Sequence, residues 1–82
     1  MYLKQLIFLC RIADEGFNVS NAAGVLHTSQ PSVSRQIQAL EEELGVAVFV
    51  RSKHRFVGLT KPGAEVLRIA RRVLRDTNDL KN

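Results

Sequence analysis

The sequence predicts a mainly α-helical domain with a short β-hairpin, and two patterns support this fold class. Up to residue 44, apolar residues recur at the three- and four-residue spacing of helix faces, with two breaks. From residue 46 onward come two short runs rich in β-branched and aromatic residues, and then a long amphipathic stretch. With 82 residues, the chain has room for one small core. The order helix, helix, turn, helix, hairpin, helix is that of a winged helix-turn-helix.

The first two predicted helices are bounded by residues that stop or start a helix. The first covers about Leu3 to Ala13 and ends near Gly16. Its Cys10 lies among apolar residues, so we expect a buried structural thiol. Because it is the only cysteine, no internal disulfide can form. Asn18 is a good N-cap for the second helix, over 19–26.

The third predicted helix begins at a cap and ends at a glycine. Thr28 or Ser29 can supply the capping hydroxyl. Pro31 is tolerated in the first turn because an N–H there has no helical partner. Gly45 ends the helix, since glycine readily adopts the left-handed conformation that follows a helix.

The segment 19–38 has the spacing of a helix-turn-helix unit. Ala23 lies midway along its first helix, where the two helices are expected to cross and only a small side chain fits. Val33, ten residues later, is expected to pack the second helix onto the first. His27 occupies the turn, where many such units have glycine, so we expect a slightly different turn.

Two short strands and a long helix are predicted for the rest of the chain. Residues 46–51 and 56–59 have the composition of strands, and 52–55 form the turn between them. Thr60 opens the last helix, whose first turn contains a proline. That helix is predicted to run to about Leu80.

The outward face of the third helix indicates a surface that reads DNA. Its apolar stripe consists of Val33, Ile37, Leu40 and Leu44. At about 100° per residue, the opposite side carries Pro31, Ser34, Arg35 and Gln38. A solvated helix face usually carries Lys and Glu, whereas this one is small, polar and able to form hydrogen bonds. Such a face suits the edges of DNA bases.

Charge is distributed unevenly along the chain. Residues 1–45 hold three basic and five acidic residues, a net charge of −2, whereas residues 46–82 hold nine basic and three acidic residues, a net charge of +6. A basic half beside a base-reading helix suits phosphate contact, although solubility is the alternative for the arginines of the last helix, Arg68, Arg71, Arg72 and Arg75. No apolar run approaches the ~20 residues that span a bilayer, and no signal peptide is recognisable, so a cytoplasmic protein is expected.

Two stretches carry a resemblance to a known family: NAAGVLHTSQPSVSRQIQALEEELGVAVFVRS at 21–52 and LTKPG at 59–63. They resemble the N-terminal DNA-binding domain of LysR-type transcriptional regulators, and the similarity covers essentially the whole chain. NVS at 18–20 and TSQPSVSRQ at 28–36 are most similar to the CysB-like branch, which regulates sulfur assimilation and cysteine biosynthesis.

The resemblance implies a winged helix-turn-helix DNA-binding domain over 1–60 and a linker or dimerisation helix over 61–82. It also implies a longer parent protein, with a periplasmic-binding-protein-like domain that binds a small-molecule effector. This chain therefore resembles an excised domain, for which we expect no cofactor and no metal of its own.

The resemblance also assigns residues that contact double-stranded DNA. In the major groove it places Ser29, Gln30, Pro31, Ser32, Ser34 and Arg35, and the facing argument adds Gln38. Arg can pair with guanine, Gln with adenine, and proline can pack on a thymine methyl group. An arginine bonded to a nearby acid is the alternative for Arg35. The wing is expected to meet phosphates or the minor groove through Arg51, Lys53, His54 and Arg55, or else to be a merely solvated turn.

The last helix predicts a homodimer. Its apolar residues span roughly 160° of the circumference, wider than the stripe of about 100° that covers one core. One seam is expected to pack on its own domain and the other on the same helix of a second chain. The residues predicted for dimerisation are Val66, Ile69, Ala70, Val73, Leu74 and Leu80. A tetramer of the full-length protein and a fragment too short to dimerise are left open.

Two other classes of function are weighed against DNA binding. An enzyme is not expected, because Cys10, His27 and His54 are far apart without metal-ligand spacing, and Glu41–Glu43 fan around a helix instead of converging. The remaining alternative is a winged-helix protein-interaction module without DNA binding. Such a module would carry an apolar or acidic outward face on the third helix.

Overall fold

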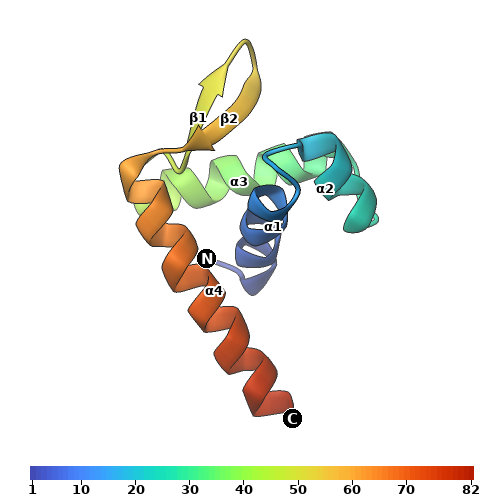
Figure 1. The fold of residues 1–82 in the computed structure, drawn as a ribbon, viewed down its shortest axis with the longest axis vertical. Coiled ribbons are helices and arrows are strands. Elements are labelled where there is room, and N and C mark those ends of the chain that lie inside the picture. The colour runs from blue at the N-terminus through green and yellow to red at the C-terminus, as the bar shows by residue number, and fades with distance from the viewer.

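Four helices and one hairpin follow each other in the predicted order. The computed structural model describes all 82 residues and contains α1 (Leu3–Asp14), α2 (Val19–Val25), α3 (Gln30–Leu44), β1 (Phe49–Ser52), β2 (Arg55–Leu59) and α4 (Lys61–Lys81). The antiparallel hairpin stands at one end of the molecule, and α4 leads away from its base past α1 (Figure 1). This arrangement confirms the mainly helical winged fold. No helix combines the length and the apolarity that crossing a membrane requires.

Capping residues set the helix boundaries. The side chains of Asn18, Ser29 and Thr60 each accept a hydrogen bond from the backbone N–H three residues later, at the starts of α2, α3 and α4. Of the two candidate caps for α3, Ser29 is therefore the one used. Gly45 ends α3 in the left-handed conformation, with φ of 73°.

The core lies where the inner faces of all four helices meet the base of the hairpin. Its members include Leu9, Ile12, Ala22, Ala23, Val33, Ile37, Leu40, Val48, Phe49 and Ala70. Burial of Ala23 and Val33 confirms the predicted crossing of α2 and α3. Cys10 is only 6% exposed, which confirms the buried thiol. Burial raises the pKa of that thiol, although the charge of Arg71 partly opposes the shift.

Two local predictions are wrong. Strand β1 begins at Phe49 and not at residue 46, because the N–H groups of Val48 and Phe49 donate to the Glu41 carboxylate and not to a partner strand. The change of turn expected at His27 is not observed, because His27 itself has φ of 57°, the left-handed conformation that glycine favours at this place.

Candidate nucleic-acid interface

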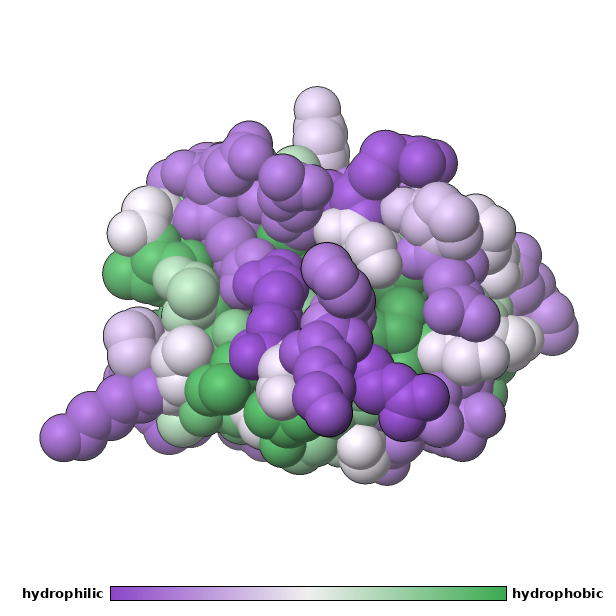
Figure 2. All heavy atoms as spheres, turned by 90° about the horizontal axis from the view of Figure 1, so that it is seen from above, coloured by the Kyte–Doolittle hydropathy of each residue, from purple (hydrophilic) through white to green (hydrophobic).

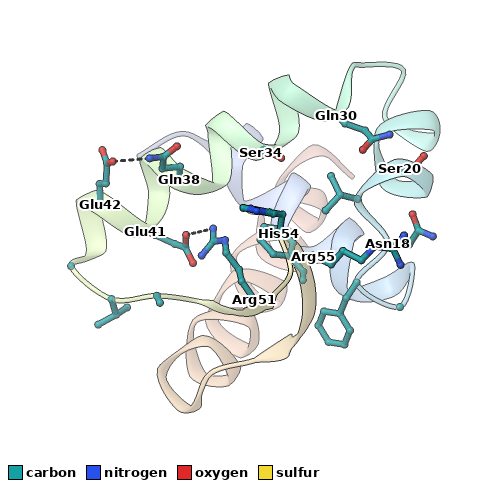
Figure 3. Close-up of a pocket in the computed structure, with 17 residues that line it drawn as sticks. Asn18, Ser20, Gln30, Ser34, Gln38, Glu41, Glu42, Arg51, His54 and Arg55 are labelled. Atoms are coloured by element: carbon teal, nitrogen blue, oxygen red, sulfur yellow. Dashed lines mark hydrogen bonds and ion pairs between the residues drawn. The ribbon is translucent and has the colours of Figure 1, made fainter.

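A groove separates the outward side of α3 from the hairpin (Figure 3). Its polar and charged lining residues are Asn18, Ser20, Gln30, Ser34, Gln38, Glu41, Glu42, Arg51, His54 and Arg55. Seen from the hairpin side, the surface is mainly hydrophilic, with apolar areas between the polar side chains (Figure 2). The tertiary structure thus brings residues of the predicted recognition helix and wing to one concave surface.

The outward side of α3 has the polar composition that its sequence predicts. The side facing the core carries the buried Val33, Ile37 and Leu40, and the exposed side carries Gln30, Pro31, Ser34, Arg35 and Gln38. Arg35 forms no ion pair, so the alternative of an arginine held by a nearby acid is not observed. Its guanidinium is available to another molecule, although Arg35 does not line the groove.

Two of the predicted recognition residues already have partners within the domain. Ser29 Oγ accepts a hydrogen bond from the N–H of Ser32 at 3.3 Å, so this hydroxyl serves as the helix cap. Gln38 Nε2 donates to Glu42 Oε1 at 3.4 Å, which leaves its carbonyl oxygen and one N–H for a base edge. In the first turn of α3, the N–H of Gln30 still suits an anion, since Pro31 has no N–H and the N–H of Ser32 is bonded to the cap.

The hairpin tip carries basic side chains without a partner. Lys53 and His54 occupy a two-residue turn with φ of 51° and 67°, the positive values of a type I′ turn. Together with Arg55 they are exposed, and Lys53 and Arg55 form no ion pair. Their contact with DNA stays a prediction.

Arg51 differs from the other predicted wing residues because it already has partners inside the domain, and its contact with DNA stays a prediction. Its Nη2 donates to Glu41 Oε1 at 2.8 Å, and its guanidinium carbon lies 4.8 Å from the centre of the Phe56 ring. An arginine paired with a carboxylate and stacked on an aromatic ring is occupied inside the domain. Arg51 therefore joins the hairpin to α3, and its side chain remains 43% exposed.

Glu41, the partner of Arg51, is a residue of the site that was not predicted from the sequence. Its side chain is 11% exposed, and Oε2 accepts hydrogen bonds from the N–H groups of Val48 and Phe49 at 2.7 and 3.3 Å. Burial opposes its ionisation, but the hydrogen bonds from Arg51, Val48 and Phe49 outweigh that effect and hold the pKa of Glu41 below its ordinary value. The one available signal was an acidic residue in the last turn of the helix that precedes a short strand.

The start of α2 also supplies groove residues that the sequence analysis did not predict. Asn18 was predicted only as a cap, and Ser20 received no role, yet both line the groove at the end where Gln30 of α3 lies (Figure 3). The polar residues of 18–20 were the signal in the sequence. Serine and asparagine side chains suit phosphate oxygens, so this edge is chemically consistent with the rest of the groove.

The arginines of α4 divide into two groups. Arg68 pairs with Glu65, and Arg71 pairs with Asp14 of α1 at 2.8 Å. Arg72 and Arg75 form no ion pair. The paired arginines thus have structural partners, and none of the four lines the groove beside α3.

The residues predicted for dimerisation differ in how far they are exposed in the structure. Ala70 is 1% exposed and belongs to the core of its own domain, so its assignment to a contact with a second chain is wrong. Val66, Val73 and Leu74 are half-buried against the same core. Ile69 and Leu80 are 44% and 88% exposed and leave apolar surface uncovered.

The groove holds no arrangement typical of a metal site or of a catalytic pair. No group of three or more His, Cys, Asp or Glu side chains in the structure is placed to hold a metal ion. The three consecutive acids of α3 have separate partners: Glu41 binds the hairpin, Glu42 binds Gln38, and Glu43 pairs with the N-terminal ammonium group. The groove is lined by hydrogen-bonding, basic and acidic side chains.

Comparisons with known proteins place this geometry in a family. The family described as "Bacterial regulatory helix-turn-helix protein, lysR family" matches residues 3–64. The HTH-type transcriptional regulator cbl of Klebsiella aerogenes is 40% identical over 81 residues, and the CysB regulator of Burkholderia cenocepacia is 42% identical over 81 residues. The match covers 99% of this chain but only 26% of either relative, so the chain spans about a quarter of their length. The ClcR regulator of Pseudomonas putida is 49% identical over 77 residues, 94% of this chain and 26% of ClcR.

Solved structures agree with this assignment. The crystal structure of the CbnR_DBD–DNA complex superimposes with a TM-score of 0.90 at 42% identity, covering 99% of this chain and 91% of that one. The BenM_DBD/catB site 1 DNA complex gives a TM-score of 0.89 at 34% identity, over 98% of this chain and 84% of that one. These relatives are transcriptional regulators and not enzymes. The chain belongs to the lysR family of bacterial regulatory helix-turn-helix proteins, and it has the fold of their DNA-binding domain.

Proposed function

We propose that residues 1–60 bind double-stranded DNA in a sequence-specific manner, with α3 in the major groove and the hairpin on the adjacent backbone or minor groove. The observation that carries this proposal is the polar outward side of α3, with its unpaired Arg35, beside an unpaired basic hairpin tip. A B-DNA major groove about 12 Å wide admits an α-helix, and its base edges present hydrogen-bond patterns that Arg and Gln can distinguish. The CbnR_DBD and BenM_DBD structures, both DNA complexes, support the proposal.

The proposed contacts divide into base reading and phosphate binding. Base edges are read by Gln30, Pro31, Ser34, Arg35 and Gln38, while the Ser32 hydroxyl and the backbone N–H groups of Ser29 and Gln30 contact phosphates. Lys53, His54 and Arg55 bind the backbone or the minor groove. An interaction module without DNA binding has less support, because the outward side of α3 is neither apolar nor acidic.

Selection from random duplexes, followed by two matched arginine variants, tests this proposal. Arg35→Ala is expected to cost about 1–3 kcal/mol on the selected site and to relax the preference at one base pair. Arg55→Ala, acting through phosphate, is expected to weaken selected and random duplexes alike and to lower the salt slope by about one. Equal losses on selected and random DNA for Arg35→Ala would refute its role in base reading, and no selected duplex would refute the function.

We further propose a homodimer through the helix over 61–82. Ile69 and Leu80 provide its exposed apolar surface, with the edges of Val66, Val73 and Leu74 beside them. A two-fold axis would place two recognition helices on paired half-sites of one DNA face. For the full-length protein we propose a cytoplasmic regulator, with a dimer or tetramer and a small-molecule effector bound outside this chain.

We also propose that the parent regulator controls genes of sulfur assimilation or cysteine biosynthesis. The relatives named cbl and CysB support this proposal by matching 99% of the chain. Because ClcR is 49% identical to this chain, the test has to include a ClcR operator as well. A CysB operator is expected to displace the selected duplex from this chain more effectively than a ClcR operator does. The opposite order would refute the assignment.

A further inference from the structure

The hairpin needs an anchor, because a two-stranded hairpin alone is marginally stable in water. On the side of α4, the Thr60 N–H donates to the carbonyl of Val48 at 2.9 Å. Inside the hairpin, the rings of Phe49 and Phe56 stack with centres 4.4 Å apart. The tip beyond them is exposed on both strands and receives no other support. Its direction therefore depends on what holds the strands near their base.

On the side of α3, that anchor is Glu41. Its carboxylate forms every hydrogen bond that joins α3 to the segment 48–52, namely to the N–H groups of Val48 and Phe49 and to the guanidinium of Arg51. Arg51 in turn lies over the ring of Phe56 on the second strand. One partly buried carboxylate thus contacts β1 directly and β2 through the stacked guanidinium. Figure 3 shows this pair between α3 and the hairpin.

The same carboxylate lies between the two surfaces that would contact DNA. Gln38, on the outward side of α3, is less than one helical turn before Glu41, and Arg55 is on the strand that Arg51 covers. A displacement of the strands relative to α3 would carry Arg55 and the tip away from a duplex held by α3. Because a long charged side chain must reach phosphate within hydrogen-bond distance, a shift of this kind removes the contact.

We infer that Glu41 is a positioning residue for DNA binding: through Arg51 and the backbone of residues 48–49, it holds the hairpin at the angle to α3 at which the tip meets the DNA backbone. This inference rests on the proposed function, since it requires that a duplex binds both α3 and the hairpin. Arg51 forms part of the same contact between α3 and the hairpin.

A double-mutant cycle tests the inference with the selected duplex as probe. Four proteins are compared: the unmodified chain, Glu41→Gln, the tip variant Lys53→Ala/Arg55→Ala, and the combination. Glu41→Gln is expected to lower the affinity of the unmodified chain about tenfold and to reduce the salt slope by one to two, roughly 0.9 for each lost phosphate. In the tip variant the same substitution is expected to change affinity by less than about twofold, because the contacts it positions are already absent.

Matched controls separate positioning from general damage. Glu43→Gln makes the same change two residues along α3, where the carboxylate pairs only with the N-terminal ammonium group, and is expected to leave affinity and salt slope unchanged. Arg51→Met keeps an apolar stem over Phe56 and removes the guanidinium, and is expected to reproduce the losses of Glu41→Gln. Should Glu41→Gln fail to fold, Arg51→Met takes its place in the cycle.

Equal losses of affinity on Glu41→Gln in the unmodified and tip-variant backgrounds would overturn the inference. Unchanged affinity in both brace variants, Glu41→Gln and Arg51→Met, would overturn it too. Absence of DNA binding by the unmodified chain would overturn the proposed function and this inference together. Binding by the unmodified chain with no effect of either brace variant overturns the inference alone.

Discussion

Replacing Gly63 by alanine is expected to destabilise the domain and to displace the hairpin. Gly63 lies in the first turn of α4 and is buried. A Cβ added there would lie 1.9 Å from the carbonyl oxygen of Val48 and 2.8 Å from its carbonyl carbon. Both are backbone atoms of a fully buried residue, so no side-chain rotation can relieve the overlap. The same carbonyl accepts the N–H of Thr60 at 2.9 Å, and moving it breaks that bond.

The magnitude of this effect follows from three contributions. Overpacking a well-packed core costs about 1–3 kcal/mol, and the lost hydrogen bond costs about 1 kcal/mol more. The better helix propensity of alanine offsets up to about 1 kcal/mol. The free energy of unfolding should therefore fall by about 1–4 kcal/mol, which lowers the Tm of a domain of this size by about 4–8 °C for each kcal/mol.

Thermal unfolding followed by circular dichroism measures this change, and Gly24→Ala is the matched control. Gly24 lies in α2 with no atom within 4 Å of an added Cβ. Alanine there should leave stability unchanged or raise it by up to about 1 kcal/mol. Because Val48 is next to the base of the hairpin, Gly63→Ala should also weaken DNA binding at a temperature where the variant is folded. A Tm equal to that of Gly24→Ala would refute the close approach of α4 to Val48.

Three further predictions concern the dimer, acid stability and the thiol. Ile69→Glu should convert a dimeric chain to monomer without unfolding it, because Ile69 is 44% exposed; sedimentation at high micromolar concentration measures this, and a monomeric unmodified chain would contradict the dimer. Since the folded pKa of Glu41 is lowered, its contribution to stability is complete above the ordinary value of 4.5 and is lost as pH falls through the folded pKa. Denaturant unfolding between pH 7 and pH 3 should accordingly show a smaller acid loss for Glu41→Gln than for the unmodified chain, and equal losses would contradict the lowered pKa. Cys10, buried and with a raised pKa, should react with a thiol reagent at least about tenfold more slowly in the folded domain than in guanidinium, and equal rates would count against its burial.

The sequence alone predicts the elements of this fold because their signals are local. Asn18, Ser29 and Thr60 are caps whose hydrogen bonds close within three residues, and the apolar stripe of α3 follows from helical geometry. The outward side of α3 follows from the same geometry, so its polar residues were predictable as a surface before their neighbours were known.

Tertiary structure alone decides the features that depend on how distant segments approach each other. The width of the apolar surface on α4 indicates two contacts, yet only packing against α1 shows that Ala70 faces its own core. The pairing of Glu41 with Arg51 and the contact of Gly63 with Val48 join separate elements. A periodic pattern gives the direction of a side chain around its own helix axis, but not the distance to another element. That distance is set by close packing of the whole core, which no local stretch of sequence contains.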